Sequence, residues 1–127
     1  MALGQNSMSR WREERAIELF LREIYGTERK NIIRLIISEG PRFPHLAEFY
    51  YREVVARGIG AVRALLTRAY ERGELRNDAI IRFPQLLVAP AIVAIIWKGL
   101  FEPQAPLDVP AMLRAHLDLL FGEGEAR

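Results

Sequence analysis

The side chains best suited to chemistry in this sequence are its two histidines, His45 and His116. His45 precedes Glu48 by three residues, so on a helix the imidazole and the carboxylate lie one turn apart. That spacing suits two metal ligands, and Glu39, across a turn, is the nearest third carboxylate. A closed metal site needs three or four ligands. Because all three residues also read as surface charges near helix ends, we expect no metal site. A metal protein or enzyme that uses Glu39, His45 and Glu48 stays an alternative.

No other segment carries a catalytic signature. The sequence has no Gly-rich phosphate loop, no serine nucleophile motif and no pair of spaced catalytic carboxylates. It has no cysteine, which excludes disulfides and thiolate metal sites and fits a cytoplasmic protein. His116 falls on an apolar stripe, where a place at an interface is favoured over a role as a base. We therefore expect no enzyme and no cofactor, and a cytoplasmic location.

The composition is that of one globular domain. Of 127 residues, 50% are hydrophobic and 27% are charged, which is enough apolar content for a single core. Eighteen basic residues oppose sixteen acidic ones, so the surface is mixed rather than the concentrated basic patch of a nucleic-acid binder. Residues 1–8 lack the basic start and apolar centre of a signal peptide. We interpret them as a flexible leader or expression remnant, residues 9–122 as the domain and 123–127 as a polar tail.

Apolar residues recur at helical spacing along the whole domain, and no alternating run with hairpin chemistry occurs. The pattern predicts an all-α fold of about five helices. Their expected ranges are about 9–25, 27–39, 44–72, 77–101 and 109–121.

Glycine, proline and short polar residues set the expected helix ends. Gly40 with Pro41 and Gly73 stop the second and third helices, and Asp108 caps the last one. Gly58 and Gly60 interrupt the third helix, each at a cost of roughly 1 kcal/mol relative to alanine. We expect either a kink there or the close approach of another backbone.

Three helices are apolar over more than one face. The second is apolar nearly all round, which predicts deep packing, and the third has a wide apolar arc that predicts cover on two sides. The fourth contains LLVAPAIVAIIW, residues 86–97, with no polar side chain. A membrane span needs about 20 apolar residues, so this run predicts no membrane helix. A second subunit is its natural cover.

Aromatic and branched side chains concentrate on neighbouring helices, as in ligand sites that lie between helices and hold a few polar groups. The alternative is that these side chains are simply core. The candidate ligand-binding residues are Ile33, Arg34, Ile37, Phe43, Phe49, Tyr50, Val54 and Trp97.

Four segments, in order, resemble the C-terminal domain of TetR-family transcriptional regulators. Residues 33–50, IRLIISEGPRFPHLAEFY, resemble a core helix that ends in E-x-x-R-F-P-E-L-A. Residues 65–75, LLTRAYERGEL, resemble L-L-x-x-G-x-x-R-G-E-L, with Tyr70 near the first glycine in place of a small residue, isoleucine or valine. Residues 86–101 resemble the penultimate helix, and residues 112–120, MLRAHLDLL, resemble the closing L-R-A-H-x-D-L-L. The likeness covers about residues 27–122.

The resemblance implies a helical effector-binding domain and a two-fold homodimer, in which the last two helices of each subunit form a four-helix bundle. A small apolar or aromatic effector would control DNA binding by a helix-turn-helix head, for which this chain has no segment ahead of its core helices. An obligate helical dimerisation module without a ligand is the alternative. The candidate dimer-interface residues are Leu87, Ile92, Ile95, Ile96, Leu113, His116, Leu117 and Leu120.

Overall fold

The structure, a computed structural model, describes residue 12 and residues 14–121, and over these residues it is all-helical without a strand. The expected leader and tail, and the start of the first expected helix, lie outside the described residues. Internal contacts divide the chain into two compact units. We call the residues up to Asn31 together with those from Pro90 onward the terminal unit, and Ile32–Ala89 the central unit.

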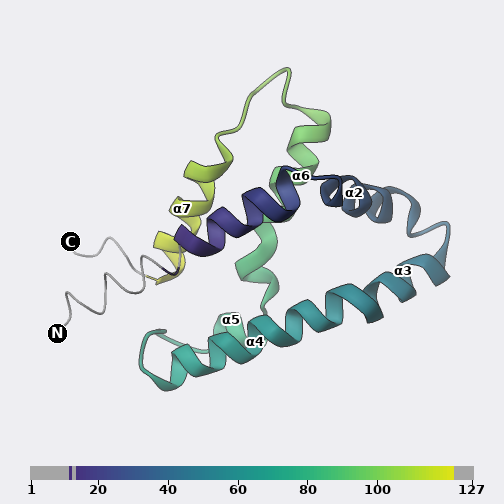
Figure 1. Ribbon diagram of the computed structural model, residues 1–127. Helices are drawn as coiled ribbons and strands as arrows, with labels where there is room; N and C mark the ends of the chain where they lie inside the picture. The colour runs from purple at the N-terminus through teal and green to yellow at the C-terminus, as the bar shows by residue number, and fades with distance from the viewer. Residues whose placement is uncertain (1–11, 13, 122–127) are drawn as a thin grey trace. The chain divides into compact units, whose positions relative to one another are not determined.

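The terminal unit contains a first helix, a π-helical turn and two long helices (Figure 1). Residues 14–20 are α-helical and run directly into the π-helix η1, Leu21–Tyr25. Helix α6, Gln85–Leu100, enters this unit at Pro90, and α7, Val109–Phe121, closes it. One buried cluster joins all three segments, and its members are Ile17, Ala94, Val109 and Leu113. The apolar stripe of the first helix is thus met by α6 and α7, which gives this unit its own core.

Side-chain contacts define the C-terminal end of α6 and the N-terminus of α7. The indole N–H of Trp97 donates to the carbonyl of Ala105 at 2.6 Å, and the Trp97 ring meets Phe101 edge-on at 5.3 Å. Both contacts close the turn that follows α6. Asp108 then accepts the backbone N–H of Ala111 at 3.1 Å, which is the N-cap expected for the last helix.

The central unit is built on one long helix. After α2, Arg29–Glu39, the chain turns into α3, Pro44–Tyr50, which continues through the π-helix η2, Tyr51–Val55, into α4, Ala56–Glu71. The short α5, Ala79–Arg82, packs on α4. Arg63 on α4 donates to the carbonyl of Ile81 at 3.0 Å, and Leu66 and Ile80 are the buried apolar side chains of this pair of helices.

The tripeptide Arg-Phe-Pro occurs twice in the central unit and forms the same helix start both times. Phe43 before Pro44 has φ −127° and ψ 76°, and Phe83 before Pro84 has φ −130° and ψ 74°. Proline forces its predecessor out of the α region, so each phenylalanine must leave the helical conformation. We expected one unbroken helix over about residues 77–101. The second tripeptide divides it into α5 and α6, because Phe83 before Pro84 cannot stay helical.

Gly73 ends α4 in a left-handed conformation, with φ 80°. The N–H of Glu74 donates to the carbonyl of Ala69 and that of Gly73 to the carbonyl of Tyr70, both at 3.0 Å. This pair of bonds is the Schellman motif, which favours glycine at the left-handed residue. The prediction that Gly73 stops the third helix is confirmed.

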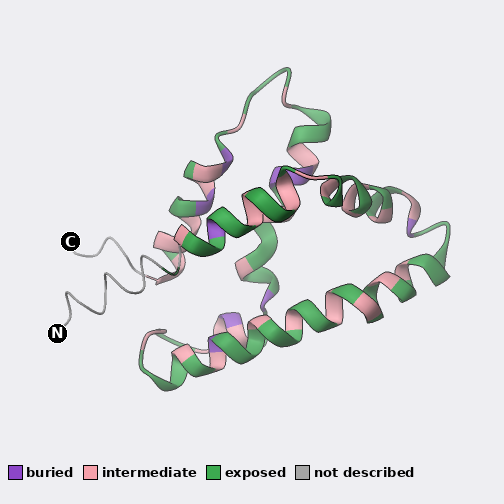
Figure 2. Cartoon of the chain, viewed as in Figure 1, coloured by how far each residue is buried: buried purple, intermediate pink, exposed green. Residues whose placement is uncertain are grey.

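The expected deep burial of the second and third helices was wrong for this chain. Helix α2 has no buried residue, and along α3, η2 and α4 only Leu66 is buried. Figure 2 shows the long helix mainly exposed. A Cβ built on Gly58 or Gly60 would meet nothing within 4 Å in the described part of the chain, so the close backbone approach suggested for these glycines is not found. Apolar periodicity indicates which helix faces need cover, and within the central unit the other described residues do not bury these faces.

Candidate functional site

The predicted ligand residues of the central unit lie on two consecutive helices. Ile33, Arg34 and Ile37 come from α2, and Phe43 lies in the turn after it. That turn is tight, since a Cβ on Gly40 would lie 2.5 Å from the carbonyl oxygen of Ile36. A side chain at position 40 would therefore force the backbone at the end of α2 to shift.

The remaining central residues, Phe49, Tyr50 and Val54, follow one another along α3 and η2. Phe49 and Val54 are about half exposed, as are Ile37 and Phe43 before them. The guanidinium of Arg52 stands over the Phe49 ring at 5.8 Å, and that of Arg42 stands over Phe43 at 5.4 Å. These surfaces offer apolar contact beside fixed positive charge, which suits a small apolar or aromatic molecule with a polar group.

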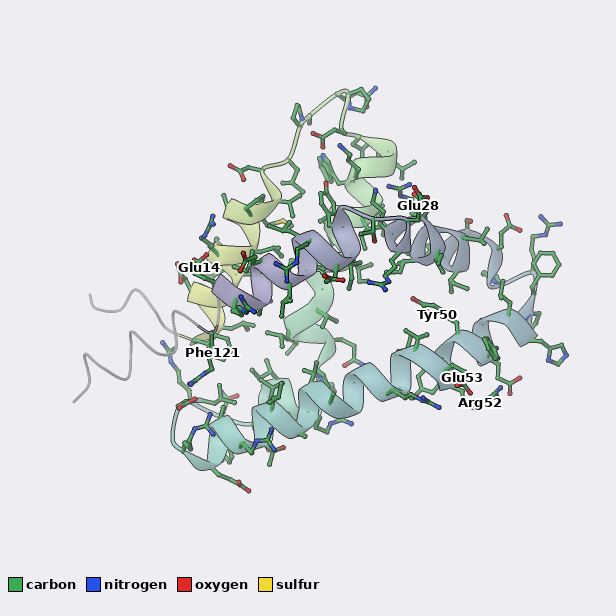
Figure 3. The ribbon with its side chains drawn as sticks, viewed as in Figure 1. Glu14, Glu28, Tyr50, Arg52, Glu53 and Phe121 are labelled. Carbon is green, nitrogen blue, oxygen red and sulfur yellow. The ribbon has the colours of Figure 1, made fainter. Side chains whose placement is uncertain are left out.

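Tyr50 is the member of this set with a perturbed side chain. Partial burial raises the pKa of its phenol above the ordinary value, because the phenolate would lose solvation. In Figure 3 Tyr50 lies on the opposite side of the helix from Arg52 and Glu53. At neutral pH the phenol is protonated, so it can donate a hydrogen bond to a ligand that reaches this face.

Trp97, the last predicted ligand residue, belongs to the terminal unit, whereas the other seven belong to the central unit. Its indole N–H is engaged by Ala105 at 2.6 Å. The structure therefore gives Trp97 a role in closing the turn after α6. Its aromatic character alone could not distinguish that role from ligand binding.

The predicted interface residues fall into two groups. Ile95 and Leu113 are buried within the chain itself, and Leu113 is part of the terminal core. The other six are partly buried on α6 and α7, and they are Leu87, Ile92, Ile96, His116, Leu117 and Leu120. Ile95 and Leu113 thus serve the subunit's own core, and Leu117 packs against that core as well.

Sequence reasoning missed the most exposed large apolar side chain of α7, which is Leu119, at 81% exposure. On the same helix Val109 and Leu113 face inward. Residue 119 lies six positions after Leu113, about 240° around the helix at 100° per residue. The sequence position of Leu119, away from the inward-facing stripe of α7, could therefore have predicted a second apolar face on this helix. On α6, Val93 and Leu100 are likewise exposed.

The metal-site alternative gains no support from the geometry. His45 is fully exposed, with Nδ1 3.7 Å from Oε1 of Glu48. Among residues 12 and 14–121, no three His, Cys, Asp or Glu side chains, Glu39 included, gather closely enough to hold a metal ion. Within the same residues, no helix has both the length and the apolar content to cross a membrane.

Residues 14–120 match the family described as Tetracyclin repressor-like, C-terminal domain. The chain belongs to this family. The matched range begins at residue 14, earlier than the likeness over about residues 27–122 seen in the sequence, so it includes the first helix, and it reaches almost to the end of α7. The resemblance and the all-α fold are therefore confirmed, and this chain is a TetR-type regulator domain. Neither a curated protein nor a solved structure matches the chain.

Proposed function

We propose that this TetR-type domain is the dimerisation and effector-sensing part of a cytoplasmic transcriptional repressor and that it is not an enzyme. The family match over residues 14–120 carries the proposal. Contact with DNA would be made by a helix-turn-helix head that these 127 residues do not include.

Dimerisation is supported by the uncovered apolar surface of the terminal unit. Leu119 on α7 and Val93 and Leu100 on α6 present large apolar side chains to solvent. Large apolar side chains left exposed on two helices of one unit are the kind of surface that a partner covers. A two-fold partner offers the same surface in return, so α6 and α7 of two subunits would bury these residues together as a four-helix bundle.

Effector binding is supported by the apolar faces of α2, α3 and η2. Ile37, Phe49 and Val54 are half exposed there, and Tyr50, whose phenol is protonated at neutral pH, follows Phe49 on α3. A small apolar or aromatic molecule would gain roughly 25 cal/mol for each Å² of apolar surface that it removes from water. It can control DNA binding only if it binds one arrangement of the dimer more tightly than the other.

Thermal unfolding in the presence of small aromatic compounds tests the effector half of the proposal. A compound at 100 times its Kd stabilises the folded state by about 2.7 kcal/mol, which is several degrees of melting temperature for a domain of this size. We expect a shift with benzoate, indole or naphthalene derivatives that Phe49→Ala reduces and that Leu65→Ala, at an exposed leucine of α4, leaves unchanged. If none of these compounds shifts the midpoint while the chain is dimeric, a dimerisation module without a ligand is favoured instead.

A further inference from the structure

The long helix of the central unit changes its hydrogen-bond register in the middle. The N–H of Tyr51 donates to the carbonyls of Ala47 and Glu48, four and three residues back, whereas that of Ala56 donates to the carbonyl of Tyr51, five residues back. The segment Tyr51–Val55 is therefore a π-helical insert between α3 and α4. Such inserts are rare, and they occur frequently at functional sites.

No buried side chain of α3 or η2 fixes the π-helical hydrogen bonds of Tyr51–Val55. No residue of α3 or η2 is buried, and Leu66 is the first buried residue of α4. The polar contacts of the insert are surface pairs, in which Glu53 meets Arg57 at 3.1 Å and Arg52 at 3.5 Å. Exposed pairs of this kind contribute little to stability.

The residues around the insert also weaken the helix. Val54 and Val55 are β-branched, which lowers helix propensity, and Gly58 and Gly60 lower it further. A Cβ on either glycine would meet open space, so packing in the described chain does not require them. Residues 51–60 therefore have little support, whereas the next turns of the helix are joined to α5 by the hydrogen bond from Arg63 and contain the buried Leu66.

We propose that Tyr51–Val55 is a register switch: the insert converts between π-helical and α-helical hydrogen bonding and turns α3 relative to α4. Conversion shifts the register by one residue, which rotates α3 by about 100° and moves it by about 1.5 Å along the axis. Because α4 is anchored, Phe49 and Tyr50 on α3 are the side chains that move. The switch does not depend on whether an effector is found.

Paired spin labels give a direct test, because the chain has no native cysteine to interfere. We would label Glu48→Cys and Arg68→Cys, which lie about 30 Å apart on a continuous helix. The expected result is two distance populations in the full chain. It becomes one population after deletion of Val55, which removes the extra residue and leaves a plain α-helix. A single population in the full chain, no broader than in the deletion variant, would overturn the switch.

Amide hydrogen exchange provides a second test that does not need a deletion. Exchange should be faster in residues 51–60 than in 61–71, and the double variant Gly58→Ala, Gly60→Ala should slow it roughly tenfold in the first range. Equal exchange in both ranges would contradict the switch.

Deletion of Ala64 is the matched control for the deletion of Val55 in the spin-label test. Ala64 lies between Arg63 and Leu66, in a part of the helix with no π-helical insert that could absorb the loss of a residue. That deletion should lower stability, whereas deletion of Val55 should not.

Discussion

The guanidinium Nε of Arg114 on α7 lies 3.1 and 3.0 Å from the two carboxylate oxygens of Glu14, which is a hundred residues earlier in the chain. The pair ties the first helix to α7 beside the core formed by Ile17 and Leu113. Both side chains are about half exposed, so water screens their attraction.

Removing this ion pair should therefore cost little, and the cost should depend on salt. We expect Arg114→Gln to lower the free energy of unfolding by about 0.5 kcal/mol in dilute buffer. The loss should fall toward zero at about 1 M salt, where the screening length is near 3 Å. Urea unfolding at both salt concentrations measures the effect, and a loss above 2 kcal/mol that salt does not change would show that the pair is not a surface contact.

The glycine at the end of α4 should be sensitive to a methyl group, because its φ is 80°. Gly73→Ala is expected to destabilise the chain by about 1–2 kcal/mol, the cost of a left-handed conformation for an alanine. Gly58→Ala is the matched control, since its Cβ meets open space, and it should be neutral or stabilising by up to about 1 kcal/mol. Equal effects of the two substitutions in thermal unfolding would contradict this account of the Schellman motif.

The phenol of Tyr50 should ionise later than an exposed tyrosine. Its pKa is raised in the folded chain by burial, so the folded state holds the proton more tightly than the unfolded state. The resulting stability is present below about pH 10 and is lost as the pH rises through the folded pKa. The difference between the ultraviolet titrations of the native chain and Tyr50→Phe gives the Tyr50 curve directly. A midpoint below pH 10 would contradict the partial burial of this side chain.

Dimer formation should fail when a charge is placed on the exposed face of α7. Leu119→Glu would bury a carboxylate in the proposed bundle, where an unpaired charge is very costly. We expect sedimentation velocity to show a monomer for this variant at concentrations where the native chain is a dimer. Leu35→Glu on α2, another exposed leucine, is the matched control and should remain a dimer. Monomers from both variants would point to general unfolding rather than to an interface.

Local chemistry made most helix ends predictable from the sequence. Asp108, Gly40 and Gly73 act through hydrogen bonds and backbone geometry within a few residues, so no tertiary knowledge is needed to place them. The end of α5 before Pro84 also follows from local backbone geometry. It was missed because the apolar residues on both sides of Pro84 continue one helical pattern.

Burial was predictable only in part. The sequence shows that α2 and the long helix carry wide apolar faces, yet it does not show whether the same chain covers them. For Ile95 and Leu113 the prediction failed in the opposite direction. Both share the periodicity of the predicted dimer-interface residues, yet both are buried inside the subunit. The π-helical insert could not be predicted, since Tyr51–Val55 has no residue type that specifies five-residue hydrogen bonding.

Native mass spectrometry of the purified chain tests the central claim most directly. Under gentle conditions we predict a species at twice the chain mass of 14.6 kDa. If the dimer retains its effector, the mass of the dimer is larger by the mass of the effector, and denaturation removes this difference. A dimer without added mass supports the dimerisation role and leaves the effector to the thermal-unfolding test. A monomer at micromolar concentration would contradict the account, because the apolar faces of α6 and α7 would then have no partner subunit.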